Sequence, residues 1–270
     1  MADVSIFRSL PARRMAAQWL PAMALAVLAL AAWQGLCATV YQGKGYLLPS
    51  PLEVADAAAG NAALLAAAAL TTLREAVLGY ALAAVFGIAL AAAMCQARLL
   101  ERCLYPYAVL LQTVPVVAVA PLIVLWSGYN ERSVVLVALI MALFPIVNNT
   151  LLGLRSTPQQ LLELFALHRA GRWRTFIRLR LPAALPHALA GLRISAGLSV
   201  IGAIVGEFII GAGNAGGGLG VQIIFAQGRM DTALLFAEVI AATLLGFALF
   251  STASGAGRML LRRWHESARE

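Results

Sequence analysis

Two acidic residues lie where apolar sequence surrounds them. Glu207 follows the uncharged run 194–206, and Glu238 interrupts the apolar run 232–257. A carboxyl group in a membrane-spanning run is costly, so such a residue is a functional candidate by default. We expect Glu207 to lie at an outer gate, where it either lines a pathway or pairs with Arg229. We expect Glu238 to face the interior, in a transport role or in a structural ion pair.

Motifs for catalysis are absent from the sequence. The glycine-rich stretch 211–220 has no preceding strand pattern and no following lysine, so it does not match a phosphate-binding loop. We expect it to be a gate or turn loop instead. The histidines form no ligand set, and the cysteines, expected to be small buried residues, show no metal-ligand spacing; these are His168, His187, His265, Cys37, Cys95 and Cys103. We therefore expect no catalytic residue, no metal and no cofactor on this chain.

The composition indicates an integral membrane protein. Of 270 residues, 61 % are hydrophobic and 12 % are charged, whereas soluble domains average about 45–50 % and about 25 %. So few charges cannot cover the surface of a soluble protein of this size. This excludes a soluble enzyme, a disordered chain and a nucleic-acid-binding domain.

Six charge-poor runs are long enough to cross a bilayer. The expected spans are about 17–37, 76–97, 104–126, 133–154, 186–207 and 232–254. No linker divides the chain, so we expect a single all-α polytopic domain over 1–270. Pro115, with Pro121 and Pro145, lies inside a span, where it permits a gating bend or a static kink. Ser195 and Ser199, one turn apart, either line a pathway or bond back to their own helix.

The basic residues orient these spans. An even number of spans places both termini on one side, and that side receives sixteen of the 20 basic residues. The other side holds Lys44, Arg74, Arg132 and Arg229. Because cytoplasmic loops carry the excess of Lys and Arg, we expect cytoplasmic termini, a cytoplasmic segment 156–182 and external segments 42–72 and 211–228.

The Arg-rich segment 156–182 predicts a compact helix–turn–helix. Thr157 is expected to cap a helix whose first residue is Pro158. Apolar residues at i, i+4 spacing favour an amphipathic helix that Gly171 ends, with a second short helix up to Pro182. Its arginines suit anionic headgroups, but an apolar helical face among them needs a protein partner to bury it.

This segment resembles the EAA loop of permease subunits of bacterial ABC importers. The family pattern is Glu-Ala-Ala, three residues, Gly, about nine residues, then Ile-x-Leu-Pro. Glu163 matches the Glu, and Leu181 and Pro182 match the end. Leucine and phenylalanine replace the two alanines, and Arg169 stands where the family has Gly.

Three further stretches resemble one group of these permeases, the nitrate/sulfonate/taurine and thiamine-precursor-like group. They are the Leu-Pro-Ser-Pro element with its following Glu-Val over 48–54, the proline-containing stretch 110–128 and the run Leu-Pro-Ala-Ala-Leu-Pro-x-x-x-Ala-Gly-Leu-Arg over 181–193. The resemblance covers roughly 45–264.

The resemblance implies a MetI-like ABC permease fold in the bacterial inner membrane. It implies a second permease copy, cytosolic ATPase subunits that bind ATP and Mg, contact with membrane lipid, and a periplasmic or lipid-anchored substrate-binding protein, with no nucleic acid. The implied solute is small, of the sulfonate/taurine/nitrate or the pyrimidine/vitamin-precursor class. The Glu207-Phe208 pair before a glycine-rich loop favours the latter.

The resemblance also assigns ATPase coupling to the helix 161–171, with Glu163 as a charge-assisted anchor. The implied coupling residues are Leu162, Glu163, Phe165, Ala166, His168, Gly171, Leu181 and Pro182. The alternative is a proton-coupled secondary transporter that uses Glu207 and Glu238 as a relay. Such a carrier has no use for a docking helix.

Overall fold

The computed structural model describes residues 12–41, 46–210 and 217–261, and within these ranges the chain is helical with no strand. The all-α prediction is therefore confirmed. The helices are α1 Ala12–Thr39, α2 Pro51–Gly60, α3 Ala62–Gln96, α4 Arg98–Thr113, α5 Val116–Ser127, α6 Glu131–Arg155, α7 Gln159–Leu167, α8 Arg172–Thr175, the π-turn Phe176–Arg180, α9 Leu181–Ile210, α10 Leu219–Gly228 and α11 Thr232–Leu261.

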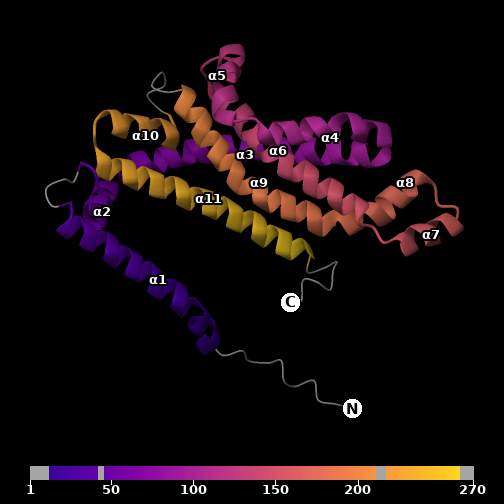
Figure 1. Ribbon diagram of the computed structural model, residues 1–270, viewed down its shortest axis with the longest axis horizontal. Coiled ribbons are helices and arrows are strands. Elements are labelled where there is room, and N and C mark those ends of the chain that lie inside the picture. Colours follow the sequence, from indigo (N-terminus) through magenta and orange to yellow (C-terminus); the bar gives the residue numbers. More distant parts are fainter. Residues whose placement is uncertain (1–11, 42–45, 211–216, 262–270) are drawn as a thin grey trace.

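Four long helices form the centre of the molecule. In Figure 1, α3, α6, α9 and α11 run side by side, and the helix pairs α6–α9 and α3–α6 make the most extensive contacts. All four are long and apolar enough to cross a membrane, with α9 continuing the helical run that starts at Arg172. They correspond to the second, fourth, fifth and sixth expected spans.

The third expected span is broken. Helices α4 and α5 are long and apolar enough to cross a membrane only when taken together, and the helical path bends by 104° between them. The break lies at Val114 and Pro115, both of which have extended backbone angles. Proline has no N–H to continue the helix and disfavours the helical conformation in the residue before it. The pair is therefore one bent span or a re-entrant loop, and a count of six spans remains compatible with the fold.

Helix α1 lies apart from the four long helices (Figure 1). Trp33 anchors it where the indole Nε1 donates to the Pro49 carbonyl at 3.1 Å and the ring lies 5.8 Å from that of Phe236 in α11. Large apolar side chains of α1, such as Leu25 and Leu28, are exposed. Its apolar part, Met23–Thr39, is shorter than a full membrane span within the described residues, so the first expected span stays a prediction.

Small residues bring the central helices into close contact. A Cβ atom on Gly79 of α3 would lie 2.6 Å from Ala138 Cβ in α6, and one on Gly202 of α9 would lie 2.7 Å from Ala138 Cα. Helices in membranes gain packing energy when small side chains let backbones approach. Both neighbours of α6 use this device, which fixes the register of α3 and α9 on α6.

The molecule has two functional ends (Figure 1). At one end, α7 and α8 extend beyond the long helices; we call this the α7–α8 end. At the other, α10 lies beside the end of α9 and the start of α11, and α2 lies beside the start of α11; we call this the α10 end. The described residues do not include Lys44, His265, the stretch 211–216 of the glycine-rich loop, or the terminal residues, so predictions for these positions fall outside the structure.

Candidate functional site

The α7–α8 end contains the helix–turn–helix predicted over 156–182, with shifted boundaries. Helix α7 begins at Gln159, and no side chain caps it. The prediction that Thr157 is the cap was wrong: its hydroxyl is buried and donates to the Leu154 carbonyl at 3.4 Å, in the last turn of α6. Pro158 therefore precedes α7 instead of opening it.

The turn after α7 comes earlier than predicted. The helix ends at Leu167, and Arg169 adopts a left-handed conformation with φ 49°. Gly171, expected to end α7, instead has φ −64° and starts α8. Glycine is the residue that takes a left-handed conformation without strain. Arg169 thus occupies the position that needs a glycine, which matches its place opposite the Gly of the EAA pattern.

Pro182 does not end the second helix, contrary to our expectation. The chain passes from α8 through the π-turn directly into α9, and the Leu181 N–H bonds to the Phe176 carbonyl five residues back. Proline has no N–H and its ring clashes with the carbonyl four residues earlier, so a wider turn before Pro182 removes both problems. The segment 156–182 is therefore continuous with a long helix that reaches the α10 end.

Helix α7 has an exposed apolar face. None of its residues is buried, and Leu167 is 81 % exposed. Leu164, Phe165 and His168 line a groove of about 380 Å³ together with Arg174 and Arg178. Glu163 is exposed and accepts a hydrogen bond from Gln159 at 3.3 Å. The predicted coupling residues Leu162 and Ala166 lie on the same helix, half-buried and exposed respectively.

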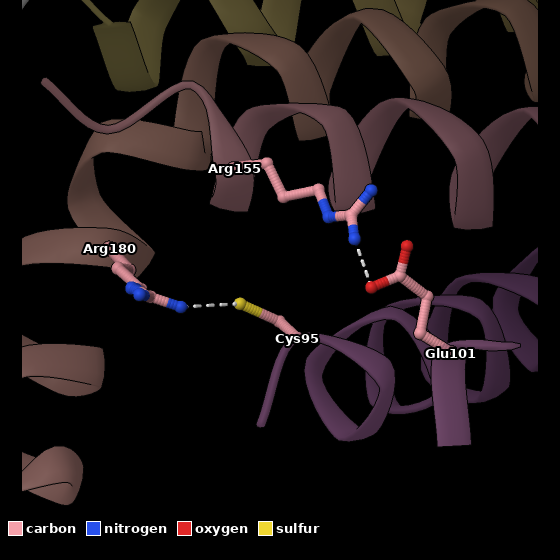
Figure 2. A network of polar contacts seen from close by, with 4 residues as sticks. All are labelled: Cys95, Glu101, Arg155 and Arg180. Carbon is pink, nitrogen blue, oxygen red and sulfur yellow. Dashed lines mark hydrogen bonds and ion pairs between the residues drawn. The ribbon is translucent and has the colours of Figure 1, made fainter. Parts of the chain in front are cut away.

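Two arginines bind the segment 156–182 to the C-terminal end of α3, where the chain turns into α4. The Arg172 guanidinium donates to the Gln96 carbonyl at 2.6 Å, and that of Arg180 donates to Cys95 Sγ at 3.2 Å. Nearby, Arg155 at the end of α6 forms an ion pair with Glu101 of α4; Figure 2 shows these last two contacts. Arg172 and Arg180 therefore link the segment to the end of α3, and the Arg155–Glu101 pair links α6 to α4 beside it.

The cysteines are less buried than expected. Cys103 is exposed on α4, while Cys37 and Cys95 are half-buried. Cys37 contacts the carbonyls of Leu48 and Pro49 through its thiol. The surface of a membrane-spanning helix faces lipid and is itself apolar. A small apolar residue such as cysteine can therefore lie on that surface without being buried in the protein.

At the α10 end, Glu207 joins three helices. Its Oε1 accepts from the Thr72 hydroxyl at 2.7 Å and its Oε2 from the Gly220 N–H at 2.6 Å. The Thr72 oxygen in turn accepts from the Leu219 N–H at 2.8 Å. Orphan N–H groups at the start of α10 are thereby satisfied. Arg229 is not among the described partners of Glu207.

Glycine is required next to this carboxyl group. A Cβ atom on Gly218 would overlap Glu207 Oε1 and Thr72 Oγ1, and one on Gly220 would lie 2.6 Å from the Ile204 carbonyl. The last residues of the glycine-rich stretch therefore pass directly over Glu207. Their lack of side chains is what lets the backbone reach the carboxyl oxygens.

Glu75 is a third buried carboxyl group, and the sequence analysis missed it. It is 6 % exposed, lies one turn after Thr72 on α3 and neighbours Glu207. The sequence does contain a signal for the burial of Glu75. The buried stripe of small residues on α3 continues at i, i+3 and i+7 through Thr72, Glu75 and Gly79. Placing the start of the second span at residue 76 concealed this periodicity.

Glu238 is fully buried in α11, and neither carboxyl oxygen has a hydrogen-bond partner among the described residues. It faces the interior, as expected, but no ion pair involving it is formed there. The chain thus keeps an unsatisfied carboxyl group in a membrane helix, which is costly.

The remaining pathway candidates are packed between helices. Ser195 is fully buried and its hydroxyl donates to the Ala142 carbonyl of α6 at 2.6 Å. The Ser199 hydroxyl, also buried, donates to Ala196 in its own helix at 2.9 Å. Pro115 lies at the break between α4 and α5. Their part in a transport pathway stays a prediction.

Comparison with known proteins shows the family of this chain. Residues 83–266 match the family described as binding-protein-dependent transport system inner membrane component. The chain is 39 % identical over 220 residues to the formylaminopyrimidine transport permease protein ThiX of Halalkalibacterium halodurans, covering 81 % of this chain and 86 % of that one. It is 37 % identical over 256 residues to the riboflavin transport system permease protein RibX of Chloroflexus aurantiacus, covering 93 % and 92 %.

A nitrate import permease protein, NrtB of Synechocystis sp., is 32 % identical over 202 residues, covering 71 % of this chain and 72 % of the relative. Each of these relatives covers more than two thirds of this chain, and the family match runs from within α3 through the α7–α8 end to beyond α11. The chain therefore belongs to the family of inner-membrane permease components of binding-protein-dependent ABC importers.

Proposed function

We propose that this permease imports a small nitrogen-containing solute, of the pyrimidine or vitamin-precursor class, and that helix α7 couples it to a separate ATPase. The permease itself is the translocation subunit of an ATP-driven importer. The observation that carries the coupling proposal is the exposed apolar face of α7 at a rigidly attached end of the molecule.

An isolated apolar helix outside the membrane is stable only when something covers it. In the proposed complex, Leu164 and Leu167 enter a groove of the ATPase, and Glu163 makes a charge-assisted contact at its edge. The link from Arg172 and Arg180 to the end of α3 supports this role, because movement of the docked helix is then transmitted to a long helix.

The remaining partners follow from the same proposal. ATP and Mg are bound by two ATPase subunits in the cytosol, and this chain binds no cofactor. Two permease copies form the pathway, with the α7–α8 end in the cytosol and both termini on that side. A periplasmic or lipid-anchored binding protein delivers the solute to the α10 end, and the whole chain acts as one domain.

The proposed solute class rests on the relatives. The permeases named for formylaminopyrimidine and riboflavin are more similar to this chain, and over more of its length, than the nitrate permease. A sulfonate, taurine or nitrate importer is the alternative within the family. A proton-coupled carrier is not supported, because the chain belongs to a family of binding-protein-dependent importers.

The test is co-purification with the ATPase encoded beside the permease. Glu163→Arg with Leu167→Glu changes only exposed residues of α7, so the protein is expected to insert and keep its thermal stability in detergent. The amount of bound ATPase should fall at least ten-fold. Asp56→Arg is the control, since it reverses an exposed charge on α2 at the other end. Full retention of the ATPase by the α7 variant would contradict the assignment.

A further inference from the structure

A cavity of about 390 Å³ opens at the α10 end, where α3, α6, α9 and the start of α10 meet. Cavities of roughly 300–1,000 Å³ are the size that holds small ligands. Three carboxyl groups line it, those of Glu75, Glu131 and Glu207, against a single guanidinium, that of Arg74.

Two of these carboxyl groups already have partners. Glu131 forms an ion pair with Arg74 at 3.2 Å on the exposed rim, where it neutralises the one cation among the described residues that line the cavity. Glu207 accepts hydrogen bonds from Thr72 and Gly220 with its two oxygens and holds α10 in place. Both groups are therefore parts of the cavity wall.

Glu75 is different. The residue is only 6 % exposed, and its Oε2 has no hydrogen-bond partner among the described residues. A buried polar oxygen without a partner costs free energy, and this one belongs to a residue that lines the cavity. A solute that donates a hydrogen bond there would remove that cost.

We propose that Glu75 is a solute-binding and specificity-determining residue of the permease, which accepts a hydrogen bond from an N–H group of a neutral or cationic nitrogen heterocycle. This inference rests on the proposed function and deepens it, since it names the atom that distinguishes the solute class. The Oε2 atom of Glu75 is the acceptor, and the cavity at the α10 end is the first site the solute enters after leaving the binding protein.

The polar groups of the cavity oppose the alternative solute class. An anion such as nitrate or a sulfonate would lie beside the Glu75 and Glu207 carboxyl groups, and the Arg74 guanidinium is engaged by Glu131. The oxygens of these anions accept hydrogen bonds and donate none, so they would leave the free Glu75 oxygen without a donor. Selectivity arises in this way from a repulsive element as well as from an attractive one.

The experiment measures uptake by the permease–ATPase complex, reconstituted in proteoliposomes with its binding protein. The probes are formylaminopyrimidine, nitrate and taurine. The variants are Glu75→Ala and Glu75→Gln, with Glu53→Gln as a control outside the cavity. ATPase content and basal ATP hydrolysis are recorded for each complex.

The wild-type complex should import the pyrimidine in preference to both anions. Glu75→Ala should lower pyrimidine uptake about ten-fold or more, as expected when a buried acceptor of the ligand is lost, while ATPase content and basal hydrolysis stay unchanged. Glu75→Gln should lose less, because its amide oxygen still accepts a hydrogen bond.

Three results would overturn the inference: preferential uptake of nitrate or taurine, no uptake of the pyrimidine, or pyrimidine uptake that Glu75→Ala leaves unchanged. Failure of the proposed function looks different, because then the wild-type permease would hold no ATPase and ATP would drive no uptake of any probe.

Discussion

Thr72 and Glu207, 135 residues apart in the chain, are joined by a buried hydrogen bond of 2.7 Å. Through it α3 is tied to α9, and the Thr72 oxygen also accepts from the start of α10. The Thr72 hydroxyl and the Glu207 carboxyl group together hold the start of α10 beside the cavity.

Thr72→Val keeps the shape of the side chain and removes the hydroxyl. The Leu219 N–H and one Glu207 oxygen then lose a partner, so we expect a loss of stability of about 1–2 kcal/mol. Thermal unfolding of the permease in detergent measures it. Thr71→Val is the matched control, because the exposed Thr71 hydroxyl bonds only to Ala67 in its own helix. Equal melting temperatures for the two variants would contradict the role of Thr72.

Two glycines of α9 allow a matched test of helix packing. Gly202→Ala would place a Cβ atom 2.7 Å from Ala138 Cα, whereas Gly197→Ala meets no atom within 4 Å. We expect Gly202→Ala to destabilise the permease by about 1–3 kcal/mol through overpacking. Gly197→Ala should be neutral or stabilising by up to about 1 kcal/mol, since alanine favours a helix interior. Thermal unfolding in detergent compares the two variants. A lower melting temperature for Gly197→Ala than for Gly202→Ala would exclude the close α6–α9 contact.

The sequence predicted the long helices well because their signal is local. Apolar runs near 133–154 and 232–254 match α6 and α11 closely at their starts, and charge asymmetry assigned the α7–α8 end to one side. Glu207 was identified because a carboxyl group in an apolar run is rare. Its partners were not, since a hydrogen bond over 135 residues leaves no trace in local spacing.

The errors have physical causes as well. The sequence predicted the bend at Pro115 only as one of two alternatives. Hydropathy reports how apolar a segment is, and it carries no information on a change in direction between two apolar helices. Thr157 is a good cap by type, but tertiary contact with the last turn of α6 engages its hydroxyl. Glu75 was missed because a boundary was drawn at the adjacent residue, although the small-residue stripe of α3 continues through it.

The left-handed Arg169 predicts opposite effects of two substitutions. Arg169→Gly removes a conformational cost of about 1–2 kcal/mol, partly offset by the greater freedom of glycine in the unfolded chain. Arg169→Pro is incompatible, since proline fixes φ near −65° and removes the N–H that bonds to Ala166 at 2.9 Å.

Hydrogen exchange of the backbone amides in the α7–α8 turn tests the two substitutions of Arg169. We expect slower exchange for Arg169→Gly and faster exchange, with reduced ATPase binding, for Arg169→Pro. Identical exchange in both variants would show that the turn does not depend on the conformation at this residue.

The ion pair between Arg155 and Glu101 is half-exposed on the arginine side. A double-mutant cycle with Arg155→Gln and Glu101→Gln should give a coupling energy of about 0.2–1 kcal/mol. The coupling should decrease at high salt, because mobile ions screen exposed charges. A coupling energy that does not respond to salt would contradict an electrostatic contact.

The most direct test of the coupling role of α7 is to isolate the permease in detergent after co-expression with its neighbouring genes. We expect an ATPase to co-purify in stoichiometric amount, its hydrolysis to rise when the binding protein and formylaminopyrimidine are added, and both to be lost in Glu163→Arg with Leu167→Glu. Uptake driven by a proton gradient through the permease alone, with no ATPase bound, would contradict that role and return attention to Glu207 and Glu238.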